Sequence, residues 1–165
     1  MINNKKIQYG IIVVSIVIAF SIIINILFSI KSPNIVFFSM KLEGNKATFI
    51  LVFLSIVQAT LLPFILLKKK FGYFGTICYF LFMLLKNIFN YISIIVFSDK
   101  YLAYKIEIAP STFEKVNKTN FILFESYGFG FMLVFYVFLI MLLIASRDYF
   151  GYIISGKLDN ELNFN

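Results

Sequence analysis

Four long runs of apolar residues alternate with short polar segments along this chain. The runs cover residues 7–30, 47–67, 71–97 and 121–145. An α-helix rises about 1.5 Å per residue, so a run of about 20 apolar residues is long enough to cross the hydrocarbon core of a bilayer. The pattern therefore predicts four transmembrane helices joined by three loops, in a single transmembrane domain that covers residues 1–165.

The lengths of the polar segments predict how these helices connect. Three lysines, residues 68–70, are all that separates the second run from the third, so these two helices should form a tight antiparallel hairpin. The first loop, 31–46, contains an apolar piece (35–40) that is too short to span and is expected at the membrane interface. The longest loop, 98–120, contains a weakly alternating stretch (101–109) that is expected to form a short strand or an extended lid. The predicted fold is an all-α, antiparallel four-helix transmembrane bundle with a longer outer loop between the third and fourth spans.

The first two runs and the tail of the chain carry further signals. The first run exceeds the 7–15 apolar residues of a signal peptide and leads into a poor cleavage site, so we expect an uncleaved first helix. Pro63 is expected to kink the second helix near its end. The tail, residues 146–165, contains aromatic and aliphatic residues that predict an interfacial anchor: Tyr149, Phe150, Tyr152, Ile153 and Ile154.

Composition supports the membrane class and excludes several others. The chain is 61% hydrophobic and 14% charged, whereas soluble domains are about 45–50% apolar and about 25% charged. With a single cysteine, Cys78, and no histidine, we expect no intramolecular disulfide, no Cys/His metal site and no cofactor. The net charge of +7 suits contact with anionic lipid, and lysines scattered between the spans argue against nucleic-acid binding.

Basic residues divide equally between the two sides of the predicted bundle, so their density has to decide the orientation. Residues 5–6 and 68–70 lie directly against the ends of spans, where the positive-inside effect is strongest. We therefore expect a multi-pass protein of the cell (inner) membrane, with both termini cytoplasmic and the longest loop outside.

Five polar residues fall inside the predicted spans: Gln58, Lys86, Asn87, Asn90 and Glu125. A lysine near the middle of a bilayer costs about 2.5–3.5 kcal/mol on insertion scales, so these side chains should face other helices or water. Two interpretations stay open. The polar residues form hydrogen bonds that hold the bundle together, or they form a face for recognition or transport.

A direct pair between Lys86 and Glu125 would neutralise both charges. The third and fourth helices run antiparallel, and Lys86 lies about 16 Å from the outer end of its run, against about 6 Å for Glu125. The two depths differ by about 10 Å, so the pair is possible if an extended Lys86 side chain and a shift of the span ends together cover that difference. Gly128 and Gly130 form a small-residue notch that another helix could approach.

Catalysis is not expected. The three aspartates, Asp99, Asp148 and Asp159, lie in a loop and in the tail, so no pair of carboxylates shares a membrane site. Ser93 is about two helical turns from Lys86, too far for a Ser–Lys dyad. The sequence contains neither a Gly-rich phosphate loop nor a zinc motif, and it is interpreted as non-enzymatic.

The stretch YKIEIAPSTFEKVNKTNFILFESY resembles the loop and last-helix start of the immunity proteins of A-type pore-forming colicins. In that family an acidic loop residue is followed by an asparagine and an apolar helix start, and Glu107 and Asn120 stand at the matching positions. IVQATLLPFILLKKK is similar to the family's second helix, which ends in basic residues. The family's Thr-Ala-Pro order is replaced here by Ala59-Thr60 with Pro63 later, and its Thr-Thr after the loop acid is missing.

The resemblance implies a four-span inner-membrane protein of a bacterium that binds the pore-forming domain of a bacteriocin and protects the producing cell. Recognition would then use the outer loop and the outer ends of the third and fourth helices. Two alternatives remain: a small transporter, or transporter subunit, with a charge relay through Lys86 and Glu125, and an assembly subunit of a membrane complex that uses the Gly128/Gly130 notch.

Overall fold

The computed structural model describes residues 4–30, 33–108 and 110–150. Its framework is four long helices: α1 (Asn4–Ser29), α2 (Gly44–Leu66), α3 (Lys70–Val96) and α6 (Lys118–Ala145). By length and composition all four can cross a membrane. The all-α class and the four predicted helices are therefore confirmed, with boundaries within a few residues of the apolar runs.

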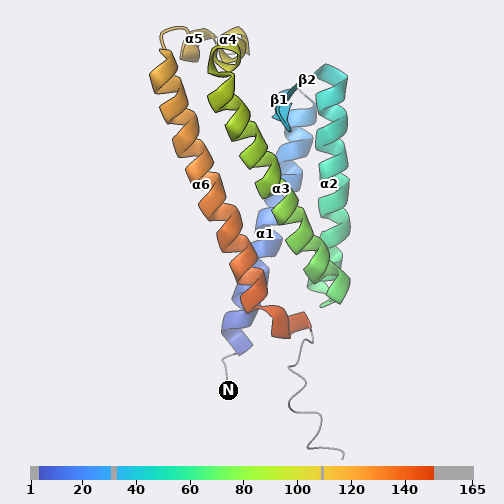
Figure 1. The fold of residues 1–165 in the computed structure, drawn as a ribbon. Helices are drawn as coiled ribbons and strands as arrows, with labels where there is room; N and C mark the ends of the chain where they lie inside the picture. Colours follow the sequence, from blue (N-terminus) through green and yellow to red (C-terminus); the bar gives the residue numbers. More distant parts are fainter. Residues whose placement is uncertain (1–3, 31–32, 109, 151–165) are drawn as a thin grey trace, which may run out of the picture.

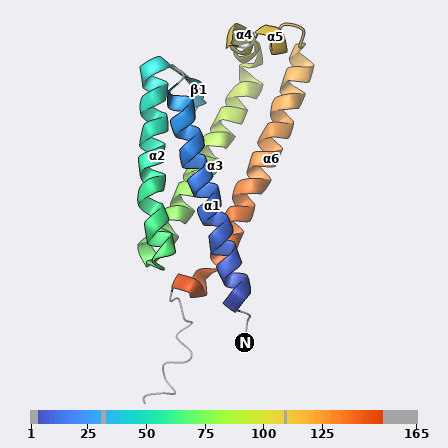
Figure 2. The same ribbon diagram turned by 180° about the vertical axis from the view of Figure 1, so that it is seen from behind.

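The helices form a closed ring in which α1 packs on α2, α2 on α3, α3 on α6, and α6 on α1 (Figures 1 and 2). The start of α1, the α2–α3 connection and the 3₁₀ helix η1 (Arg147–Phe150) lie at one end of the bundle, so both ends of the described chain are on the same side. The main core lies within this ring, and Val14, Ile65 and Leu139 are fully buried there.

The opposite end, which we call the hairpin end, carries four short elements (Figure 1). They are β1 (Asn34–Phe37), β2 (Met40–Glu43), α4 (Ser98–Ile108) and α5 (Pro110–Phe113). Strands β1 and β2 pair antiparallel, with Asn34 opposite Glu43 and Phe37 opposite Met40. The apolar piece of the first loop thus folds into a β-hairpin.

The expectation of a strand or an extended lid in the longest loop is wrong, because residues 98–108 form helix α4. Tyr101 and Tyr104 are one helical turn apart and both are buried, which an extended chain could not achieve on one face. Asp99 in the first turn and Lys105 in the last turn also complement the helix dipole. A small second core of Ile94, Tyr101 and Phe121 fixes α4 to α3 and α6.

The predicted tight hairpin of the second and third helices is confirmed. Lys68 turns the chain with a positive φ of 59°, and the Lys69 N–H donates to the Phe64 carbonyl at 2.9 Å. Gly72 then passes directly over the end of α2: a Cβ atom on it would lie 2.5 Å from the Phe64 carbonyl carbon and 2.6 Å from the Ile65 nitrogen. Only glycine fits this crossing without moving a backbone.

Among the residues of the predicted interfacial anchor, Phe150 is the one whose side chain the structure describes, and the others lie outside the described side chains. Phe150 is only 3% exposed, with its ring centroid 5.0 Å from that of Tyr73. The large apolar ring is therefore drawn into the bundle. Helix α2 continues through Pro63 to Leu66.

Candidate recognition site at the hairpin end

Asn90 holds the β-hairpin on α3 through both ends of its side-chain amide. Its Oδ1 accepts from the Ser39 N–H at 2.8 Å, and its Nδ2 donates to the Val36 carbonyl at 3.0 Å. From α4, the Tyr101 hydroxyl donates to the Ser39 carbonyl at 2.8 Å. Asn90 and Tyr101, which are far from Ser39 in the sequence, thus hold the Ser39 backbone in place by hydrogen bonds.

These contacts fix an unusual turn. Phe38 and Ser39 have φ angles of 45° and 68°, as in a two-residue type I′ turn, where asparagine and glycine are the usual residues. Positive φ in other residues costs free energy and persists where the surroundings impose it. The Ser39 hydroxyl bonds to the Phe89 carbonyl and to the Ser93 hydroxyl, and the Phe38 ring lies 5.4 Å from that of Phe82.

Lys41 links the hairpin to α4 through charge. Its Nζ lies 2.6 Å from Glu43 and 3.2 Å from Glu107, and 4.1 Å from the centre of the Tyr104 ring. The hydrogen bond to Glu43, followed by that to Glu107, raises the pKa of Lys41, while burial raises the pKa of the Tyr104 hydroxyl. Exposed ion pairs add little stability, so this cluster contributes charge to the surface of the hairpin end more than support to the fold.

Glu125 pairs with Lys105 of α4, at 3.3 Å between Oε1 and Nζ. The pair with Lys86 is therefore not formed, and Lys86 makes no hydrogen bond or ion pair with any residue that the structure describes. The reason is the fold of the longest loop. Residues 98–108 form helix α4, which brings Lys105 to Glu125 near the start of α6. A charge relay from Lys86 to Glu125 gains no support from this geometry.

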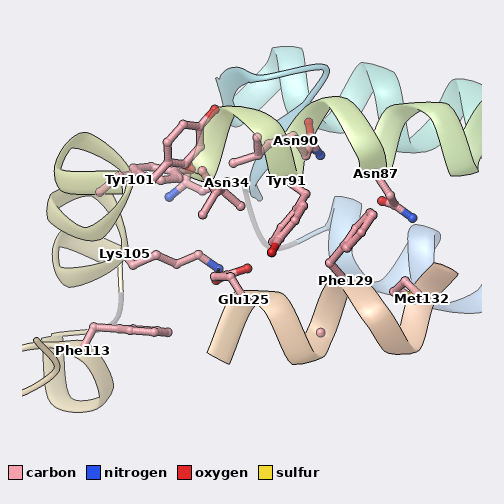
Figure 3. A pocket seen from close by; sticks show the side chains of 14 residues that line it. Asn34, Asn87, Asn90, Tyr91, Tyr101, Lys105, Phe113, Glu125, Phe129 and Met132 are labelled. Atoms are coloured by element: carbon pink, nitrogen blue, oxygen red, sulfur yellow. Dashed lines mark hydrogen bonds and ion pairs between the residues drawn. The ribbon is translucent and has the colours of Figure 1, made fainter. Parts of the chain in front are cut away.

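A cavity of about 400 Å³ lies between α3, α4, α6 and β1 (Figure 3). Asn87 extends into it from α3, and the Lys105–Glu125 pair closes the end nearest α4. The rings of Tyr91 and Phe129 stack in parallel across the gap, with centroids 4.2 Å apart. The Tyr91 hydroxyl also bonds to the Ser126 hydroxyl at 2.8 Å, joining α3 to α6.

The structure separates the other predicted site residues. Gln58 lies in the α1–α2 contact, where it accepts from the Asn25 amide at 3.2 Å and donates to the Ser21 hydroxyl at 2.7 Å. It therefore holds the bundle together. Glu107 is 71% exposed on α4, and Asn120 is exposed in the first turn of α6, where its N–H donates to the Asn117 side chain at 2.8 Å.

The predicted Gly128/Gly130 notch is not filled by any other helix that the structure describes. A Cβ atom built on either glycine meets nothing within 4 Å. The notch therefore leaves that face of α6 open beside the cavity.

Sequence reasoning missed Ser39, Tyr101, Tyr104 and Lys105. A helical interpretation of residues 98–108 would have placed the last three together, because they are three and four positions apart. Ser39 gave no signal, since its role depends on a turn that its own residue type does not favour.

In the part of the chain that the structure describes, no three His, Cys, Asp or Glu side chains gather as a metal site would need. The hairpin end thus offers a charged surface on a hairpin whose backbone is held in place, with a polar cavity beneath it. Comparisons with models of protein families, with curated proteins and with solved structures found no match for this chain.

Proposed function

We propose that this chain is a non-enzymatic integral membrane protein that acts by recognition at its hairpin end, and that it protects a bacterial cell from a pore-forming bacteriocin. The observation that carries the proposal is the gathering of fixed polar groups at this one end. Asn87 and Asn90 of α3 lie there beside the β-hairpin and α4. The rest of the bundle buries mostly aliphatic side chains.

A recognition surface needs charges that stay in place before the partner arrives. The hairpin turn is held at its backbone by Asn90 and Tyr101, and Lys41 joins Glu107 of α4 to the hairpin. Complementary charge gives specificity and speeds encounter more than it adds affinity. Such a surface suits the discrimination of one toxin from its relatives.

The proposed orientation places both termini in the cytoplasm of the producing cell and the hairpin end outside the inner membrane. Residues 68–70 at the opposite end support it, because lysines beside span ends favour the cytoplasmic side. A pore-forming domain that enters from outside would then meet α4 and the hairpin first.

The test is a protection assay. Bacteria that express the chain are challenged with a panel of pore-forming bacteriocins while the membrane potential is followed, and we expect one toxin to lose at least about tenfold in potency. Glu107→Arg should abolish this protection, because it reverses the charge to which the surface of the matching toxin would be complementary. Asp159→Arg, the same charge change in the tail, is the matched control. Equal protection by both inserted variants would contradict recognition at the hairpin end.

A further inference from the structure

We propose that the cavity between α3, α4 and α6 binds the headgroup of a phospholipid that carries both a primary amine and a phosphate, as phosphatidylethanolamine does. The inference does not depend on protection from a toxin. It rests on two buried polar atoms of cavity-lining residues that lack partners, on the charge of the cavity wall, and on the depth of the cavity along α6.

Two residues that line the cavity contain a buried polar atom without a partner. Asn87 Nδ2 and the Tyr104 hydroxyl are buried and make no hydrogen bond with any described residue, whereas Glu125 Oε1 is buried and has Lys105 Nζ at 3.3 Å as an ionic partner. Tyr104 is 93% buried, since only 7% of its surface is exposed. Buried polar atoms without partners are rare in native proteins. A bound molecule with an acceptor would satisfy the Asn87 amide, and a donor on the same molecule could add a hydrogen bond to Glu125 beside its ion pair with Lys105.

The charge of the wall selects the class of molecule. Lys105 and Glu125 are the charged residues that line the cavity, so its net charge is zero, with one positive and one negative group 3.3 Å apart. A ligand of net charge would enter without a counter-charge, whereas a zwitterion can place its phosphate at Lys105 and its ammonium at Glu125. A primary ammonium can donate a hydrogen bond to Oε1, and a trimethylammonium group cannot.

The depth of the cavity points to a lipid. Helix α6 has 28 residues, so it is about 42 Å long, close to the roughly 40–45 Å of a bilayer with its headgroups. Glu125 is seven residues from the start of α6, about 10 Å along the axis, near the boundary of headgroups and acyl chains. Below it, Gly128 has open space beside it and Met132 is 42% exposed, which leaves a path for an acyl chain.

The experiment measures lipid retention on the intact purified chain. Native mass spectrometry in detergent compares phosphatidylethanolamine, phosphatidylcholine and phosphatidylglycerol with identical acyl chains. We expect phosphatidylethanolamine to be retained at least about tenfold better than either of the others. Equal retention of the three lipids overturns the proposal, because only water or unselective lipid then fills the cavity. Free O-phosphoethanolamine is added as a competitor: if it binds as tightly as the lipid, the ligand is a soluble compound and the lipid assignment is overturned.

Two variants test whether the lipid binds in the cavity. Glu125→Gln removes the negative charge and should abolish the preference for phosphatidylethanolamine. Asp99→Asn is the matched control, because it removes a lysine-paired carboxylate at the surface of the same end, and it should retain the preference. An unchanged preference in Glu125→Gln overturns the proposal. If that variant fails to fold, the comparison of lipids on the native chain still decides.

Discussion

Replacing Asn90 with leucine is expected to release the β1–β2 hairpin from α3. The variant loses both hydrogen bonds of the amide and leaves the Ser39 N–H and the Val36 carbonyl without their partners. With about 1 kcal/mol for each bond, the docked state should lose about 2 kcal/mol, or about thirtyfold in the opening equilibrium. An isolated two-stranded hairpin is marginally stable at best, so the released strands should also fray.

Amide hydrogen exchange of residues 34–43 measures this release directly. Asn87→Leu is the matched control: the same substitution on the same helix, at a residue that makes no hydrogen bond to the hairpin. We expect fast exchange in Asn90→Leu and native exchange in Asn87→Leu. Equal protection of the hairpin in both variants would show that Asn90 does not hold it.

Gly72→Ala is expected to destabilise the whole bundle. The new Cβ atom would lie 2.5 Å from the Phe64 carbonyl carbon, so α3 must move away from the end of α2. Overpacking of this kind typically costs about 1–3 kcal/mol, and here no flexible side chain can yield. The readout is the thermal unfolding midpoint in detergent, which should fall.

Gly128→Ala is the matched control for this prediction, because its Cβ meets nothing within 4 Å. Alanine also favours the helix over glycine by up to about 1 kcal/mol, so this variant should unfold at the native midpoint or slightly above it. If Gly72→Ala unfolded no earlier than Gly128→Ala, the close crossing of α2 and α3 would be wrong.

The four spans could be predicted from sequence because each is set by a single local property, the length of an apolar run. The tight α2–α3 hairpin followed for the same reason, since residues 68–70 leave no room for another path. In the candidate site, the sequence singled out Asn87, Asn90 and Glu125, because polar groups inside apolar runs are costly and need partners.

The partners of those groups could not be predicted, because they depend on how the loops fold. The Phe38-Ser39 pair is a poor match to a type I′ turn and adopts it in contact with α3. Residues 101–109 showed only a weak alternation in the sequence. The face of α4 formed by Tyr101 and Tyr104 is recognisable as buried only once α3 and α6 lie beneath it. The comparison of depths along the helices therefore could not identify Lys105 as the partner of Glu125.

The most direct test of the hairpin end is a charge exchange between Lys105 and Glu125, followed by thermal unfolding. Lys105→Glu or Glu125→Lys alone places like charges side by side and should lower the unfolding midpoint. The double variant restores an opposite pair and should recover most of the loss, whereas Lys86→Glu combined with Glu125→Lys should show no recovery beyond the sum of the single changes. Recovery with Lys86, and none with Lys105, would contradict the arrangement of α4 over α6 on which the recognition site and the lipid cavity both depend.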